Sequence, residues 1–162
     1  MNRRLFITLL CGVIFGLLLF SWPIACRLPN LDRLNRTRTE PKKADLLGTW
    51  VLNKSSLAEM QSIGGYDIFI QPKLILRVDG NFELVHMPDW WDNGSGKSRK
   101  GFQDYAGSWG LSTYGNTGLW HVDLKSSSRT SSASLLGQSP PYSIEFIIGD
   151  PDSNVSMTFE KS

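Results

Sequence analysis

The sequence predicts an all-β protein: an antiparallel meander barrel, or alternatively a small two-sheet sandwich, preceded by an N-terminal hydrophobic helix. Three observations predict this class. Residues 45–162 contain short runs in which apolar and polar side chains alternate, as in strands with one buried face. Turn residues separate these runs at short intervals. No long segment of this region has the apolar period of an amphipathic helix.

The composition divides the chain into three parts. Residues 1–26 form a signal or membrane-anchor segment, residues 27–44 a basic tether, and residues 45–162 the β-barrel domain. The tether holds six basic and two acidic residues, whereas the barrel domain holds nine basic and thirteen acidic ones. A mildly acidic domain argues against nucleic-acid binding, which needs a basic face. We expect the tether to be a solvated spacer; contact with anionic lipid headgroups is the alternative.

The N-terminal segment is uncharged from Leu5 to Cys26 and follows two arginines. As a helix its 22 residues would span about 33 Å, enough to cross a hydrocarbon core of about 30 Å. Three interpretations stay open: an uncleaved transmembrane helix, a lipoprotein signal with Cys26 as the lipidated residue, and a cleaved secretory signal. Pro23–Cys26 resembles a bacterial lipobox at its last three positions and departs from it at the first, where Leu is usual.

The orientation of this segment has conflicting signals. The six basic residues of the tether would keep the following domain in the cytoplasm under the positive-inside rule. The short basic N-terminus followed by an apolar run is the usual arrangement for export. We expect export, with the barrel domain periplasmic or otherwise extracytoplasmic. Both cysteines, Cys11 and Cys26, lie in the apolar segment, so the barrel domain has no disulfide.

The first half of the barrel domain contains three predicted strands and one helix. Residues 47–52 are rich in strand-forming side chains. Ser56 and Glu59 have the spacing of a capping box, which predicts a short helix after them. Residues 73–78 and 81–86 read as strands joined by Asp79-Gly80, and this pair predicts a tight hairpin because Gly accepts the positive φ of the turn.

The second half of the barrel domain adds four predicted strands, at residues 105–111, 119–125, 142–148 and 155–161. Trp120, Val122 and Leu124 share one face of their strand. The intervening stretch Ser126–Ser134 is polar and of low complexity, which predicts a loop. The domain therefore has seven strands or more.

Several short motifs resemble one known group of proteins. They are Leu47-Gly48-Thr49-Trp50 at the first strand, Asp79-Gly80-Asn81-Phe82 in the hairpin, and Gly107-Ser108-Trp109. Together they resemble the lipocalin-like small barrels of bacterial envelope proteins, in which the Trp of the first Gly-x-Trp plugs one end of the barrel. The segment 148–153 and the Met-x-Phe-Glu-Lys ending resemble a recurrent ending of bacterial proteins. The resemblance implies a location in the bacterial cell envelope and a ligand-carrying role.

Two familiar site motifs fail on their spacing. Gly96-Lys97-Ser98 matches the end of a nucleotide-binding P-loop, but Trp91 stands where the first Gly is needed, and Pro88 is expected to break the preceding strand. Asp150, Asp152 and Asn154 begin like a calcium loop, but the Gly and Glu that complete it are replaced. The two histidines form no visible set with other residues. We therefore expect no catalytic residues, no metal ligands, no cofactor and no enzyme activity.

Trp90 and Trp91 are the candidate ligand or partner residues. Adjacent side chains of a strand point to opposite faces, so one indole can be exposed. Either one ring caps the barrel mouth and the other packs on its loop, or the pair forms an aromatic lip for an apolar ligand, a glycan or a partner. We expect a membrane-anchored envelope protein whose barrel binds an apolar small molecule or a protein. The alternative is a structural or assembly protein with a filled barrel, which large inward side chains would favour.

Overall fold

The computed structural model describes residues 35–67, 69–89, 101–148 and 155–162. Four features of the sequence lie outside this part: the apolar run with Cys26, the pair Trp90 and Trp91, the Gly96-Lys97-Ser98 motif, and the Asp150–Asn154 motif. Among the described residues, no helix has the length and apolar character needed to cross a membrane.

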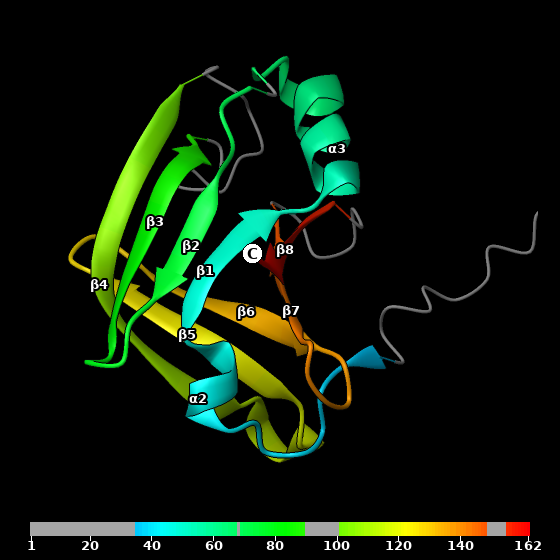
Figure 1. Cartoon of the computed structure of the whole chain (residues 1–162), viewed down its shortest axis with the longest axis vertical. Coiled ribbons are helices and arrows are strands. Elements are labelled where there is room, and N and C mark those ends of the chain that lie inside the picture. The colour runs from blue at the N-terminus through cyan, green and yellow to red at the C-terminus, as the bar shows by residue number, and fades with distance from the viewer. Residues whose placement is uncertain (1–34, 68, 90–100, 149–154) are drawn as a thin grey trace, which may run out of the picture. The chain divides into compact units, whose positions relative to one another are not determined.

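The domain is a closed barrel of eight antiparallel strands (Figure 1). Each strand pairs with the next one along the chain, and the last pairs with the first, where Val51 lies opposite Glu160. The all-β meander barrel is thus confirmed, and its closure excludes the open sandwich. The strands are β1 (Gly48–Leu52), β2 (Lys73–Leu76), β3 (Asn81–Pro88), β4 (Phe102–Thr113), β5 (Trp120–Ser126), β6 (Thr130–Leu136), β7 (Ser143–Ile147) and β8 (Ser156–Lys161).

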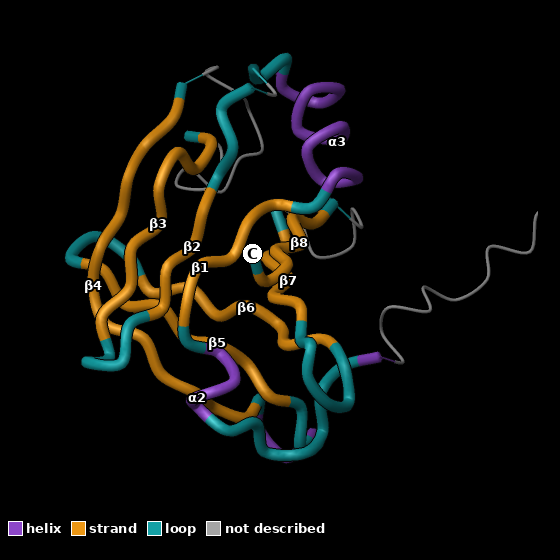
Figure 2. Tube along the Cα trace, viewed as in Figure 1, coloured by secondary structure: helices purple, strands orange, loops and turns teal. Residues whose placement is uncertain are grey.

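Short helices lie at opposite ends of the barrel (Figure 2). Helix α2 (Lys43–Leu46) precedes β1 and helix α3 (Lys54–Gly64) follows it. Because the strands alternate in direction, the β4–β5 connection with its 3-10 turn η2 (Gly115–Thr117) lies at the α2 end. The end of β3 and the start of β4 lie at the α3 end. We call these the strap end and the helix end, the strap being residues 35–43.

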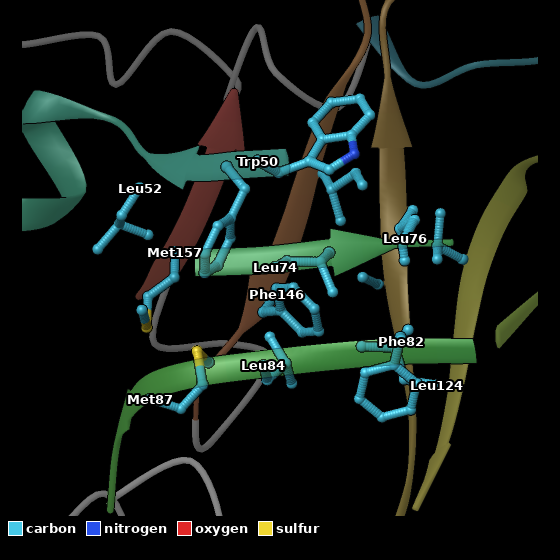
Figure 3. Close-up of a cluster of buried hydrophobic side chains, with 14 of the residues drawn as sticks. Trp50, Leu52, Leu74, Leu76, Phe82, Leu84, Met87, Leu124, Phe146 and Met157 are labelled. Atoms are coloured by element: carbon cyan, nitrogen blue, oxygen red, sulfur yellow. The ribbon is translucent and has the colours of Figure 1, made fainter. Parts of the chain in front are cut away.

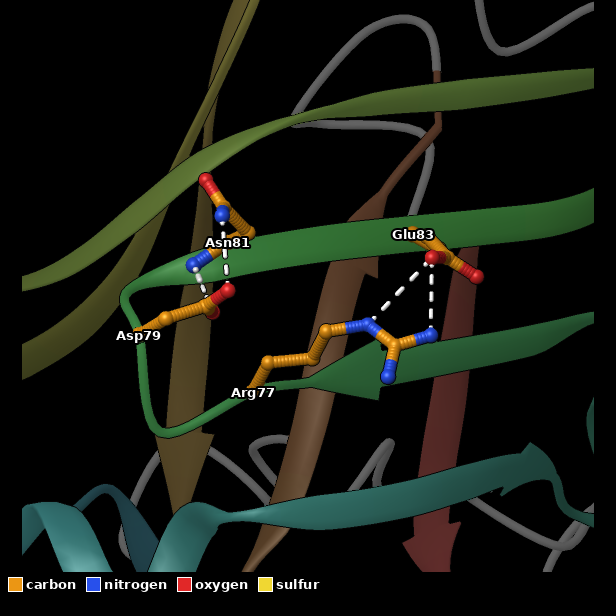
Figure 4. Close-up of polar contacts among 4 residues, drawn as sticks. All are labelled: Arg77, Asp79, Asn81 and Glu83. Carbon is orange, nitrogen blue, oxygen red and sulfur yellow. Dashed lines mark hydrogen bonds and ion pairs between the residues drawn. The ribbon is translucent and has the colours of Figure 1, made fainter.

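The predicted hairpin joins β2 and β3 (Figure 4). Gly80 has a φ of +81°, and the Asp79 carboxylate accepts a hydrogen bond of 3.0 Å from the main-chain nitrogen of Asn81. Hydrogen bonds from Asn81 lower the pKa of Asp79 below its ordinary value. Across the hairpin, Arg77 forms an ion pair of 2.8 Å with Glu83. The turn is therefore held by local polar contacts on an exposed surface.

Helix α3 begins before the predicted capping box, so that prediction is wrong in its position. The N-cap is Asn53, whose side-chain oxygen accepts a hydrogen bond of 2.9 Å from the Ser56 nitrogen. Ser56 lies inside the helix, and its hydroxyl accepts a hydrogen bond of 3.0 Å from the main chain of Thr158 in β8. Asn is as good an N-cap as Ser, and here the Ser side chain is used to fasten the helix to the barrel.

The predicted loop Ser126–Ser134 is also wrong, because most of it forms strand β6. Its residues pair with β5 from Lys125 opposite Thr130 to His121 opposite Ser134. Inward-facing Ala133 is completely buried, while the serines are mostly outside the core. Small polar side chains carry little strand signal of their own, and the pairing partner decides the structure.

Pro88 belongs to a strand, although proline was expected to break it. It is the last residue of β3 and still pairs, opposite Phe102 of β4. The pairing of β3 shifts register between Leu84 and Met87, at the position where His86 has a φ of +57°. Strand β2 starts opposite Val85, so the last part of β3 pairs on one side only, where proline is tolerated.

The barrel interior is filled by its own side chains (Figure 3). Leu74, Leu84, Val122, Ile144 and Phe159 expose none of their surface. The rings of Phe146 and Phe159 meet edge to face, with centroids 5.6 Å apart. Side chains this completely covered have no water-sized space beside them, so this described part of the core is close-packed. Other members are Leu52, Leu76, Phe82, Leu124, Leu135 and Met157.

Trp50 closes the strap end. Its ring is fully buried, and its indole nitrogen donates a hydrogen bond of 2.9 Å to the Leu46 carbonyl of α2. The Lys161 ammonium lies 5.8 Å from the centre of the ring and donates to the Asp45 carbonyl at 2.8 Å. This is the plugging position that the resemblance implies for the Trp of Gly-x-Trp. The architecture is compatible with a lipocalin-like barrel.

The strap is bonded to the barrel through its main chain. The Thr37 nitrogen donates to the Leu135 carbonyl at 2.9 Å, and the Thr37 carbonyl accepts from the Trp120 nitrogen at 3.0 Å. Gly137 donates to the Asn35 carbonyl at 2.7 Å, and Thr37 itself is completely buried. Residues 35–44, which were expected to belong to the solvated tether, therefore lie against the barrel between the ends of β5 and β6.

Candidate functional site

A buried carboxylate organises the helix end. Asp89 follows β3 directly and is 7% exposed. One of its oxygens accepts a short hydrogen bond from the hydroxyl of Tyr66, and the other accepts from the Gly101 nitrogen at 3.2 Å. The Asp89 nitrogen also donates to the Gly101 carbonyl at 3.0 Å. These bonds hold together the two ends of the segment that contains Trp90 and Trp91.

Aromatic rings surround this carboxylate. The rings of Tyr66 and Phe102 meet edge to face at 5.4 Å, and His86 meets the same Phe102 ring at 6.4 Å. The main-chain nitrogen of His86 donates to the Asp104 carboxylate at 2.7 Å. These contacts join the end of β3 to the start of β4 and to Tyr66.

One large apolar side chain projects from the helix end. Phe69 is 91% exposed, and its main-chain nitrogen donates to the side chain of Asp67 at 2.9 Å. It is three residues from Tyr66, which binds the base of the segment with Trp90 and Trp91. Those two candidates themselves lie outside the described residues. Sequence reasoning did not find Tyr66, Asp89 or Phe69, because contacts between residues 23 positions apart leave no spacing signal.

A polar groove of about 380 Å³ runs along the outside of β7 and β8. Its walls are the first turn of α3 and the connection between β6 and β7. Glu59 and Glu160 are its charged residues, and hydroxyl and amide side chains make most of the rest: Asn35, Asn53, Ser55, Ser56, Ser143, Ser156 and Thr158. Asn53 and Ser56 already serve to cap and fasten α3, which gives this groove a structural role.

A second open groove, of about 630 Å³, lies at the strap end. Its basic wall is Lys42 and Lys43, and its apolar wall is Leu111 and Trp120; Glu40 and Pro41 complete it. Both lysines are exposed, whereas Trp120 is half-buried.

Tyr114 and His121 extend this surface beside the groove. Tyr114 is 70% exposed, and its ring lies 5.9 Å from the imidazole of His121. The pKa of His121 is lowered below its ordinary value, first by burial and then by the positive charge of Arg36, while Asp123 acts in the opposite direction. The strap and the β4–β5 connection therefore form one continuous surface.

The described part of the chain contains no group of three or more His, Cys, Asp or Glu side chains placed to hold a metal ion. The comparisons do not assign a family: no family model, no curated protein and no solved structure matches this chain.

Proposed function

We propose that this chain is a membrane-anchored protein of the bacterial cell envelope whose barrel is a non-enzymatic structural or assembly module. In this proposal the barrel acts through its outer surface and carries no ligand inside. The observation that supports it most is the filled interior, where Leu74, Leu84 and Phe159 expose no surface. Small barrels of eight strands hold a ligand only when their inward side chains leave room.

The anchored location is supported by the sequence. The uncharged run Leu5–Cys26 has the length of a transmembrane helix. The motif around Trp50 resembles bacterial envelope barrels, and the chain ending resembles a recurrent ending of bacterial proteins. Metabolic labelling with palmitate, in wild type and in Cys26→Ser, separates the three possible forms of this segment. Label that is lost in the variant identifies a lipoprotein. Without label, a full-length chain that resists alkaline extraction identifies a transmembrane helix, and a shortened soluble chain would contradict anchoring.

The absence of cargo is tested on protein purified from its native membrane. Native mass spectrometry should show the bare chain, with no stoichiometric fatty acid or lipid beyond any covalent modification at Cys26. Added fatty acids should not quench the buried tryptophans, Trp50 and Trp109. A bound apolar species together with saturable quenching would contradict the filled-barrel proposal.

The rival function is contact with an apolar ligand or protein at the helix end. The exposed ring of Phe69 favours it, because Phe69 is 91% exposed and lies three residues from Tyr66, whose hydroxyl binds the Asp89 that precedes Trp90 and Trp91 in the chain. Under this alternative, Trp90→Ala, Trp91→Ala and Phe69→Ser each reduce binding of an envelope partner, while the matched change Val78→Ser at an exposed hairpin has no effect.

A further inference from the structure

The strap end carries basic and aromatic side chains on one surface. We define the basic patch as Arg36, Arg38, Lys42, Lys43, Tyr114 and Trp120. The patch has one part on the strap and one part on β5 and the β4–β5 connection, and the hydrogen bond from the Trp120 nitrogen to the Thr37 carbonyl joins them. Lys42, Lys43 and Trp120 line the same groove. In the described part of the chain, the one ion pair joins Arg77 and Glu83, so the cations of the patch are not neutralised by a carboxylate.

The charge of the strap contrasts with that of the barrel. Residues 36–43 contain four basic residues and Glu40, a net charge of +3, whereas residues 44–162 contain nine basic and thirteen acidic residues. A negatively charged surface attracts the strap and repels the rest of the domain. Such an arrangement orients the barrel with its strap end toward the negative surface.

The chain length limits how far the patch can be from the membrane. If residues 5–26 are anchored, as the proposed function states, only nine residue steps separate Cys26 from Asn35. Even fully extended, they span at most about 32 Å. The headgroups therefore stay within reach of the patch, and their charges act over a screening length of about 8 Å at physiological ionic strength.

From this placement, we propose that the basic patch docks on anionic phospholipid headgroups of the anchoring membrane. Lys42, Lys43 and Arg38 contact the phosphates. Tyr114 and Trp120 lie at the level of the headgroups, where amphipathic rings are favoured. Each basic residue near an anionic surface increases binding about fivefold. The docked barrel then holds its helix end, with Phe69, away from the membrane and toward a partner.

The test uses the full chain in lipid nanodiscs and measures how fast a water-soluble reagent acetylates each lysine, by peptide mass spectrometry. Compared with phosphatidylcholine discs, discs rich in phosphatidylglycerol should slow the labelling of Lys42 and Lys43 at least about fivefold. The labelling of Lys54 at the start of α3 should not change. Salt at about 1 M, where the screening length is about 3 Å, should restore the fast rate.

A pair of charge-reversal variants controls for net charge. Arg38→Glu should abolish most of the protection of Lys42 and Lys43, whereas Lys73→Glu, the same change on β2, should leave it intact. Thermal melting checks that both variants fold. Equal labelling of the two lysines in both kinds of disc would overturn the proposal, and so would protection that appears only in native membranes containing protein. If the chain leaves the discs at high salt, the anchor has failed instead, which separates this inference from the proposed function.

Discussion

At the strap end the Trp50 ring and the main-chain hydrogen bonds of the strap close the barrel, whereas at the helix end a buried carboxylate gathers one side-chain and one main-chain donor. Thr37 bonds to both β5 and β6 through its backbone, and Trp50 fills the space under α2. At the other end, Tyr66 and Gly101 converge on Asp89.

This difference assigns different tasks to the two ends. Main-chain bonds join the strap to β5 and β6, so the backbone around Thr37 is fixed relative to the barrel. The helix end depends on a few polar atoms around Asp89 and carries the exposed ring of Phe69, which suits contact with a partner. Under the proposals above, the strap end faces the anchor and the helix end faces a partner.

The largest expected effect is loss of the plug at the strap end. Trp50→Ala removes a fully buried ring and its bond to Leu46, and should lower the free energy of unfolding by about 3–5 kcal/mol. Urea denaturation measures this. Tyr114→Ala, an exposed aromatic at the same end, should change stability by less than about 0.5 kcal/mol. Similar losses for both variants would contradict a plugging role.

At the helix end, Tyr66→Phe removes one donor from the buried Asp89 carboxylate. The expected loss is about 1–3 kcal/mol, because the buried carboxylate loses one of its hydrogen-bond donors. Tyr114→Phe is the matched control and should be neutral. A neutral Tyr66→Phe would mean that side-chain closure of this end is unimportant.

A smaller effect is expected when the strap is loosened. Thr37→Val keeps the shape of the buried side chain and removes its hydroxyl, which donates to the Gly137 carbonyl, at a cost of about 1 kcal/mol. Hydrogen exchange at the Trp120 nitrogen, which donates to Thr37, should become faster. Thr39→Val on the exposed part of the strap should leave the exchange rate unchanged. Unchanged exchange in Thr37→Val would contradict the idea that the strap is a working part of the sheet.

The smallest effect is a pH dependence at the strap end. Burial and Arg36 lower the pKa of His121, so the unfolded chain takes up this proton at a higher pH than the folded one. The free energy of unfolding is therefore not reduced by His121 above about pH 6.5, where the imidazole is neutral in both states. It falls as the pH is lowered below this value, because the unfolded chain binds the proton more tightly. His121→Gln should flatten the melting temperature between about pH 7 and 5, and Arg36→Gln should flatten it partly. A steeper dependence in His121→Gln would reverse the assigned sign.

The sequence predicts the strands whose side chains alternate clearly. Seven of the eight follow from local pattern, and Asp79-Gly80 locates the β2–β3 hairpin correctly. Strand β6 escapes prediction because Thr130–Leu136 is mostly serine and small side chains, and its structure comes from pairing with β5. A sequence pattern therefore reveals a strand when the strand buries large apolar side chains at every second position.

The two candidate surfaces depend on contacts that the sequence does not encode locally. The strap has the composition of a solvated spacer, but the bonds of Thr37 are made by its main chain and are independent of composition. The need for glycine at position 107 is also set by a distant contact. A Cβ there would lie 2.0 Å from the Lys125 carbonyl oxygen, and this clash can be recognised only once the pairing of β4 with β5 is known. The alternation places Trp120 on one face with Val122 and Leu124, and the structure shows it half-buried in the wall of a surface groove.

The filled interior is the central claim, and a cavity made on purpose tests it most directly. Phe146→Ala should open a dry apolar space in the core, and calorimetric titration with benzene should then show saturable, stoichiometric binding. Wild type, titrated in the same way with benzene and with a fatty acid, should show none. The account would be contradicted if wild type bound either compound stoichiometrically and if this binding were lost when Leu84, inside the barrel, is replaced by the bulkier Trp.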